Sequence, residues 1–270
     1  MYRLVDAAGS QVLLVQGDGR DLSMLEDESV DCIITDHPYE DTASNKGGNR
    51  NFATYDTFKY AAQDFVEKAR VLKEGAFLVE FFAEENANNF AYIHQCKLWA
   101  LEAGFQYYAA VPWKKGNFVS NTGRKAKNVE QMLFFTKGPA RSLKLDAKKN
   151  KQALEALGVD ASKLSSYEVA AQLSEYGVPV AYMKGAAGML PTVFDVPKTP
   201  KAETIHQAEK PVALFEQLLG FVSLPGEKVV DQFAGSGNLG VAAARCGRDA
   251  ILVEKNPEVW ERMCEHVRAA

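Results

Sequence analysis

The sequence has few cysteines, and none of them has the spacing of a metal site. Cys32, Cys96, Cys246 and Cys264 are scattered over 270 residues with no CxxC pair. This argues against a zinc site and against a disulfide framework in a chain of this size. We expect reduced, mostly buried thiols and no metal.

Long apolar runs are also missing. No window approaches eighteen consecutive apolar residues, and the opening MYRLVDAAGS has neither the basic region nor the apolar core of a signal peptide. We therefore expect no membrane span and a cytoplasmic protein. With 47% hydrophobic and 24% charged residues, the chain can form one full α/β domain with an inserted lobe.

Excess charge of one sign is absent overall, because the net charge is −4. The sum hides an asymmetry: residues 114–163 carry twelve Lys and Arg against four Asp and Glu, a local charge of +8. A solvated basic face without function would explain this stretch. A polyanion lying along it is the alternative, because each neutralised phosphate releases a counterion. The candidate phosphate contacts are Lys114, Lys115, Arg124, Lys125 and Lys127.

Short apolar runs alternate with helical patterns along much of the chain. Seven runs predict buried strands, at 11–16, 30–35, 76–82, 105–113, 130–136, 228–233 and 250–254. Helical spacing of apolar residues occurs at 60–72, 86–102, 210–223, 238–246 and 256–268. This alternation predicts an α/β fold with an open, largely parallel sheet covered by helices on both faces.

Residues 139–201 interrupt this rhythm. The segment follows Gly138, contains KLDAKKNKQ and two short helical candidates, and ends in the Pro-rich stretch MLPTVFDVPKTP. We interpret it as an inserted lobe between 1–138 and 202–270.

The stretch VVDQFAGSGNLG, from residue 229, has the strongest local pattern. A strand ends at Asp231, glycines at 235 and 237 allow a tight turn, and a helix begins near residue 238 with free N–H groups. Nineteen residues after Gly235, the next strand ends at Glu254, where a carboxylate can accept ribose hydroxyls. A nucleotide-type ligand is therefore expected here, although a tight turn without any ligand has the same pattern.

The identity of that ligand depends on the neighbouring residues. Taken literally, the glycines form GxGxxG, which on its own suggests NAD and an oxidoreductase. Asp231 and Phe233 precede them, however, and few residues remain for a second half of a dinucleotide fold. A carboxylate at the strand end repels a pyrophosphate but pairs with the ammonium of a methionine group. S-adenosylmethionine (AdoMet) is therefore favoured.

A second motif, TDHPYE, follows the apolar run at 30–35. It resembles the (D/N/S)PP(Y/F/W) motif of amino-methylating DNA methyltransferases, and DQFAGSGNLG with Glu254 resembles their AdoMet-binding region. The catalytic motif comes first and the AdoMet loop last, which is the circularly permuted order of the beta class. LVQGDGRDL, PWKKGN, VEQMLFFTKG and HQAEKPVALFEQLL are similar to further family segments. The resemblance covers about 1–138 and 202–270.

The resemblance implies a class I AdoMet-dependent methyltransferase fold, Rossmann-like, with a largely parallel seven-stranded sheet. It implies that residues 1–138 and 202–270 form the catalytic domain and that 139–201 form a target-recognition lobe. It also implies double-stranded DNA as partner, a possible homodimer, and a bacterial or phage origin with a role in restriction–modification. The implied AdoMet-binding residues are Asp18, Lys210, Asp231, Phe233, Ala234, Gly235, Ser236, Gly237 and Glu254.

The resemblance also implies a role for each residue of TDHPYE. The target is an exocyclic amine, whose lone pair is delocalised into the base. Asp36 and the main-chain carbonyl of residue 37 would accept the two amine hydrogens and localise that lone pair. Tyr39 would stack on the flipped base, and Pro38 would hold residue 37 extended.

His37 departs from the family pattern, which has proline there. Because Pro38 still restrains the backbone and the acceptor is a carbonyl, the chemistry can survive the change. An altered target and a loss of activity are the two alternatives, and the new ring could touch the base or Asp36. A simple turn after a strand is the structural alternative for the whole motif.

Our functional prediction is a DNA methyltransferase that prefers adenine N6 over cytosine N4, because Asp leads the motif. An RNA or protein-glutamine methyltransferase of the same fold is an alternative, since the motif specifies a planar amine or amide. A nucleic-acid-binding relative that has lost turnover is another, and His37 is its main support. An NAD oxidoreductase is the last.

Overall fold

The computed structural model describes residues 1–38, 57–116, 128–183, 189–200, 204 and 209–270. By its internal contacts the chain forms two compact units. The first joins Met1–Pro139 to Leu190–Ala270, and the second is Ala140–Met189.

The first unit contains the β-sheet and most of the helices. Its strands are β1 (Tyr2–Ala7), β2 (Ser10–Gln16), β3 (Val30–Thr35), β4 (Leu72–Ala83), β5 (Phe105–Lys114), β6 (Val129–Lys137), β7 (Phe194–Asp195), β8 (Lys228–Asp231) and β9 (Asp249–Glu254). Its helices are α1 (Ala62–Val71), α2 (Phe90–Glu102), α5 (Val212–Val222), α6 (Asn238–Arg245) and α7 (Pro257–Arg268).

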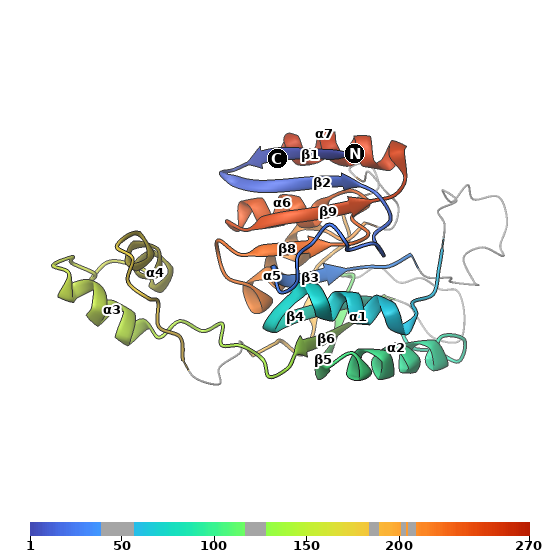
Figure 1. Ribbon diagram of the computed structural model, residues 1–270, viewed down its shortest axis with the longest axis horizontal. Helices are drawn as coiled ribbons and strands as arrows, with labels where there is room; N and C mark the ends of the chain where they lie inside the picture. The colour runs from blue at the N-terminus through green and yellow to red at the C-terminus, as the bar shows by residue number, and fades with distance from the viewer. Residues whose placement is uncertain (39–56, 117–127, 184–188, 201–203, 205–208) are drawn as a thin grey trace. The chain divides into compact units, whose positions relative to one another are not determined.

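These strands form one mixed sheet in the order β1-β2-β9-β8-β3-β4-β6-β5-β7 (Figure 1). The neighbours from β2 to β4 run parallel, whereas β1 and β6 pair antiparallel with the strands beside them. All six residues of β3 are buried, as expected for a central parallel strand covered on both faces. Strands from the two ends of the chain therefore lie side by side in the middle of the sheet.

Helices cover both faces of this sheet (Figure 1). Phe65 of α1 and Ile93 of α2 share one buried apolar cluster with Ile33 of β3. On the other face, the ring of Phe81 lies 6.2 Å from that of Phe215 in α5. Apolar residues at helical spacing thus bury one stripe of each helix against the strands.

The second unit is small and helical. It contains α3 (Ala147–Ala156) and α4 (Ser166–Glu175), together with a bridge between Leu145 and Tyr182. Its core consists of four buried side chains, Leu154, Ala161, Val169 and Leu173. Ser165 caps α4 through a reciprocal capping box with Glu168, which satisfies two N–H groups at the helix start.

The fold class expected from the sequence is confirmed, and all seven apolar runs are strands. Within the described residues, two further strands bring the sheet to nine, rather than the expected seven. β1 was missed because its burial alternates and leaves Tyr2 and Leu4 exposed. β7 has two residues, too few to show a pattern. It pairs with β5, and the compact first unit includes Leu190–Ala270.

Candidate active site

The two motifs lie at neighbouring strand ends. β3 ends at Thr35, just before Asp36, and the adjacent parallel strand β8 ends at Asp231. The Thr35 hydroxyl donates a hydrogen bond of 3.0 Å to Oδ1 of Asp231, across 196 residues of sequence. The carboxyl ends of neighbouring parallel strands are where open α/β sheets bind ligands. The structure therefore brings Asp36 and the glycine loop together at one edge of the sheet.

The glycine loop is held by backbone contacts to the end of β9. The Ala234 N–H donates to the carbonyl of Val253 (2.9 Å), and the Gly235 N–H donates to Oε2 of Glu254 (3.0 Å). Ala234 and Ser236 are buried within this loop. Glu254 thus fixes the turn through one oxygen, and its other oxygen accepts the Asn256 N–H (2.8 Å).

Two glycines of the loop have different reasons to be glycine. Both have positive φ, +52° at Gly235 and +81° at Gly237. A Cβ at Gly237 would lie 2.7 Å from the Met263 side chain, so packing excludes it. A Cβ at Gly235 would meet nothing within 4 Å among the described atoms. Gly235 therefore faces open space that the cofactor predicted from the sequence can fill.

Asp231 lies beneath this loop and has an unusual ionisation state. It is buried, and burial raises the pKa of Asp231 to about 7, although the Phe233 N–H and the Thr35 hydroxyl both donate to it and act in the opposite direction. A carboxylate that is costly to ionise gains from a cationic ligand, which removes part of that cost. The loop therefore favours a positively charged group near Asp231.

The turn after β2 closes the same edge of the sheet. At Gly19 a Cβ would lie 1.8 Å from the carbonyl oxygen of Gln232, and the Gln232 side chain donates to the Gly19 carbonyl (2.6 Å). Asp18 accepts the Arg20 N–H (3.0 Å) and forms an ion pair with Lys255 (3.3 Å). The Asp18 carboxylate thus stabilises its own turn.

Asp36 is one end of a chain of ion pairs. Lys210 contacts Oδ2 of Asp36 and lies 3.1 Å from Oε2 of Glu130, and Lys115 contacts Oε1 of Glu130. Burial would raise the pKa of Glu130, but Lys210 and Lys115 hold it at about 2. Burial raises the pKa of Asp36, and Lys210 opposes that shift. Oδ1 of Asp36 is shielded from solvent and has no hydrogen-bond partner among the described residues.

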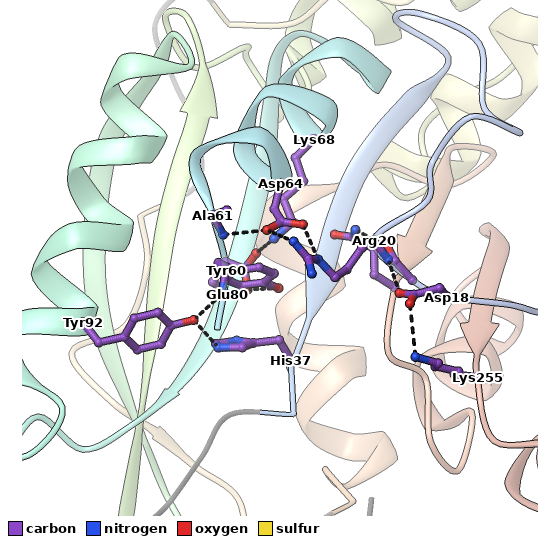
Figure 2. A network of polar contacts seen from close by, with 12 residues as sticks. Asp18, Arg20, His37, Tyr60, Ala61, Asp64, Lys68, Glu80, Tyr92 and Lys255 are labelled. Carbon is purple, nitrogen blue, oxygen red and sulfur yellow. Dashed lines mark hydrogen bonds and ion pairs between the residues drawn. The ribbon is translucent and has the colours of Figure 1, made fainter. Parts of the chain in front are cut away.

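The side chain of His37 is buried in a cluster of aromatic rings (Figure 2). Its ring centroid lies 4.1 Å from that of Tyr60 and 5.3 Å from that of Phe82. Its Nε2 lies 2.9 Å from the hydroxyl of Tyr92, which also accepts the Tyr60 N–H (2.8 Å). Burial lowers the pKa of His37 well below its usual value, so the ring is neutral near pH 7.

Aromatic contacts continue from His37 to the glycine loop. Phe58 lies 5.9 Å from the His37 ring and 5.3 Å from the ring of Phe233. The guanidinium of Arg20 covers Phe58 at 5.0 Å and is held by a two-bond ion pair with Asp64 (Figure 2). Phe233 is therefore fixed by the same cluster that fixes His37.

A buried ion pair lies next to the aromatic cluster (Figure 2). Lys68 of α1 contacts Glu80 of β4, both are fully buried, and the Tyr60 hydroxyl donates to Glu80 (3.2 Å). The Lys68 ammonium also lies 3.6 Å from the Tyr60 ring centre. The sequence interpretation missed this pair. A carboxylate inside the apolar run AFLVEFF was the available signal, because a buried charge requires a partner.

Other residues singled out from the sequence are not all at this site. Lys114 forms an ion pair with Asp195 (2.6 Å). Lys115 forms an ion pair with Glu130. Trp113, which directly precedes Lys114 in the PWKKGN segment, is fully buried and donates to the Val196 carbonyl (2.8 Å), so it is a core residue. Tyr39, Arg124, Lys125 and Lys127 lie outside the described residues.

Among the described residues, no group of three or more His, Cys, Asp or Glu could hold a metal ion. No helix in the described part of the chain is long and apolar enough to cross a membrane. The four cysteines are free thiols, and three of them are buried.

Comparison with known proteins decides the family. The model of the DNA methylase family of N6 and N4 methyltransferases matches residues 30–265. The chain belongs to this family. The match includes both motifs, the sheet from β3 to β9 and the inserted segment. Membership confirms the expected enzyme class, an AdoMet-dependent DNA methyltransferase, and sets aside the NAD oxidoreductase.

Individual relatives agree with this assignment. The type II methyltransferase M.HpaI of Haemophilus parainfluenzae is 26% identical over 251 residues, which are 91% of this chain and 70% of M.HpaI. The structure of M1.HpyAVI in complex with SAM matches 95% of this chain and 98% of its own, with a TM-score of 0.61 and 18% identity. The cytosine-N4-specific PvuII DNA methyltransferase matches 98% and 89%, with a TM-score of 0.56 and 17% identity.

Proposed function

We propose that the enzyme transfers a methyl group from AdoMet to the exocyclic amine of a flipped DNA base, with adenine N6 preferred over cytosine N4. The observation that carries this proposal is the position of Asp36. It follows β3 directly beside the Asp231 end of β8, and its Oδ1 lacks a hydrogen-bond partner among the described residues. An amine hydrogen would satisfy that buried acceptor.

The residues around the glycine loop suit AdoMet. Gly235 leaves open space beside it, Asp231 gains from a cation, and Glu254 is placed at the end of β9 where a ribose would be met. AdoMet supplies a methyl group on a positively charged sulfonium. We propose that Asp231 binds the ammonium of the methionine group and that Glu254 accepts from the ribose. Asp18, Phe233, Ala234, Ser236 and Gly237 would line or shape the remaining pocket.

The acceptor side consists of the strand end after β3. Asp36 Oδ1 and the main-chain carbonyl of His37 would accept the two amine hydrogens, so that the nitrogen lone pair leaves the plane of the base. The Pro38 carbonyl accepts the Phe58 N–H (3.1 Å), which holds this turn. The sulfonium of bound AdoMet would give up its methyl group and leave as a neutral thioether, and the methylated nitrogen would lose one proton. Asp36, whose pKa burial raises, is placed to accept it.

The inserted segment is proposed to contact DNA. Lys148 and Lys149 are exposed in the first turn of α3, within the second unit. Exposed lysines of this kind bind phosphates without reading sequence. The preference for adenine is supported by Asp at the head of the motif, while a related fold in the PvuII enzyme is cytosine-N4-specific.

The test is an identification of the methylated nucleoside. Purified protein is incubated with labelled AdoMet and a mixed-sequence DNA duplex, and the digested nucleosides are separated. Label in N6-methyldeoxyadenosine supports the full proposal. Label in N4-methyldeoxycytidine would show that cytosine, rather than adenine, is the target base. RNA and protein are supplied in parallel reactions, and label in RNA or in protein glutamine would show that DNA is not the substrate. AdoMet binding without transfer to any acceptor would show a binding protein without methyltransferase activity.

The role of Asp36 is tested in the same assay. Asp36→Asn should lower transfer at least about 100-fold, because the amide presents a weaker acceptor to the amine. Asp31 of the same strand is a matched control, since it also forms an ion pair with a lysine, Lys73 (2.7 Å), at the opposite end of β3. Asp31→Asn should retain the transfer rate. Equal rates for Asp36→Asn and Asp31→Asn would remove Asp36 from the mechanism.

A further inference from the structure

Among the described residues, Lys210 is the only lysine that forms ion pairs with two carboxylates of the site region, and its own side chain is only 6% exposed. The ammonium contacts Asp36 on one side and Glu130 on the other. It also lies 5.3 Å from the ring centre of Phe81. Two carboxylate partners can offset the cost of removing this ammonium from water. Its burial would lower the pKa of Lys210, but Asp36 and Glu130 raise it, so the group is charged.

The backbone of Lys210 is fixed to the other half of the site. Its carbonyl accepts a hydrogen bond of 2.8 Å from the side-chain amide of Asn238, the first residue of α6 after the glycine loop. The oxygen of that amide lies 2.9 Å from Nε2 of His266 in α7. Pro211 directly follows and caps α5. Lys210 therefore has a fixed origin beside the glycine loop and a side chain that ends at Asp36.

The charges around Asp36 oppose one another. Lys210 and, more weakly, Lys115 favour its ionised form, whereas Glu130 disfavours it. Asp231 and Glu80 are two further carboxyl groups close enough to interact with it. Burial also raises the pKa of Asp36. Lys210 is the largest favourable charge on Asp36, so the ionised state depends on it.

We propose that Lys210 is a positioning residue that keeps Asp36 ionised and binds its Oδ2, so that Oδ1 is left for the target amine. This inference rests on the proposed role of Asp36 as the amine acceptor. It replaces the expectation that Lys210 binds the cofactor. The Lys210 ammonium already binds two carboxylates. If it also lay beside AdoMet, the positive charge of the sulfonium would repel it.

The experiment measures single-turnover methyl transfer between pH 5.5 and 9.5 at saturating AdoMet and DNA, so that binding does not limit the rate. Lys210→Met removes the charge and keeps an unbranched side chain. Its rate should fall at least about 10-fold at pH 7 and recover toward pH 9, because the acid limb moves up when an opposite charge is removed. Lys210→Arg keeps the charge and should restore the wild-type acid limb.

Glu130→Gln should shift the acid limb of the pH–rate profile in the opposite direction. Glu130 is a negative charge that disfavours ionised Asp36, so its removal should move the acid limb to lower pH. Lys73→Met is the matched control, because Lys73 pairs with Asp31 at the far end of β3 (2.7 Å). Its profile should coincide with wild type. Opposite shifts for Lys210→Met and Glu130→Gln are a signature that a loss of packing does not produce.

The outcomes separate the two proposals. If Asp36→Asn retains wild-type transfer, the proposed acceptor fails and Lys210 has nothing to position. If Asp36→Asn abolishes transfer but Lys210→Met keeps the wild-type acid limb, the inference about Lys210 alone fails. Thermal melting and AdoMet titration of each variant identify unfolded protein. If Lys210→Met is unfolded, the shift of Glu130→Gln decides, and an unchanged or upward shift overturns the inference.

Discussion

Nε2 of His37 lies 2.9 Å from the hydroxyl oxygen of Tyr92. The ring that stands in place of the family's proline is thus directed into the protein (Figure 2). Two alternatives for this residue were contact with the base and contact with Asp36, and the contacts to Tyr60, Phe82 and Tyr92 describe a third arrangement. A proline stiffens this backbone through its ring. Here the buried side chain provides an anchor instead.

His37→Pro should therefore lower stability and activity rather than improve the motif. Removing a large buried ring leaves a cavity, which costs about 3 kcal/mol in the free energy of unfolding. Urea unfolding and the labelled transfer assay measure the two effects. Exposed His94 on α2 provides a control, since His94→Gln should change neither. A more active His37→Pro enzyme would instead support the view of the natural protein as an impaired relative.

Tyr92→Phe tests the same anchor from the other side. It removes the hydroxyl that contacts His37 and accepts the Tyr60 N–H, and a buried polar group left without a partner costs about 1 to 3 kcal/mol. The double variant Tyr92→Phe/His37→Pro should be less destabilised than the sum of the single variants, because they share one interaction. Additive effects in urea unfolding would show that the two residues act separately.

Asp231 should make AdoMet binding sensitive to pH. Its pKa is raised by burial to about 7, so below that pH the carboxyl is largely protonated, and a bound ammonium favours its ionised form. AdoMet should then bind more weakly as pH falls below about 7 and release a fraction of a proton at pH 6.5, but none at pH 8.5. Calorimetry in buffers of different ionisation enthalpy measures this release. Asp231→Asn should abolish it, and release that persists in the variant would assign it elsewhere.

The same shift has a defined effect on the stability of the protein without ligand. The pKa of Asp231 in the folded protein, about 7, lies above the ordinary aspartate value of 3.8 that applies in the unfolded chain. Its contribution is therefore present at low pH and is lost as pH rises through about 7. The difference in melting temperature between wild type and Asp231→Asn should thus narrow or reverse as pH rises, and saturating AdoMet should reduce this dependence.

Gly235→Ala should weaken AdoMet binding more than it weakens the fold. A methyl group would enter the open space beside the loop, and the positive φ of +52° adds strain of about 1 kcal/mol. Gly226→Ala is matched, since Gly226 also has positive φ (+80°) and nothing within 4 Å of its Cβ. Both variants should lose similar stability, but Gly235→Ala alone should raise the AdoMet Kd at least about 10-fold. Equal Kd values would place the cofactor elsewhere.

Lys148 and Lys149 should contribute to DNA affinity without changing the target base. Lys148→Gln/Lys149→Gln removes two exposed charges from α3, and the plot of log affinity against log salt concentration should lose a slope of about 2. Arg262 and Arg268 are exposed on α7, so Arg262→Gln/Arg268→Gln serves as the charge-matched control. An unchanged salt slope for the α3 variant would remove the second unit from the DNA interface.

Local hydrophobic patterns in the sequence predicted the strands of the fold, but they could not predict contacts between side chains that are far apart in the sequence. Every apolar run became a strand because burial on both faces requires continuous apolar sequence. The pairing of Lys210 with Asp36 joins residues 174 positions apart, and no spacing rule reaches that far. Lys115 shows the same limit. Its place in a basic stretch predicts a phosphate contact, and the structure shows an ion pair with the partly buried carboxylate of Glu130, 15 positions along the chain.

The adjacency of β3 and β8 also constrains how the protein is made. Thr35 and Asp231 are 196 residues apart, and ribosomes add about 5 to 20 residues per second. The edge of β3 that pairs with β8 therefore lacks its partner for on the order of ten seconds or more during synthesis, and its unpaired N–H and C=O groups are available for wrong pairing. We expect the nascent chain to need shielding by chaperones until β8 emerges. The incomplete polypeptide already carries TDHPYE but lacks the glycine loop, so it would not methylate DNA.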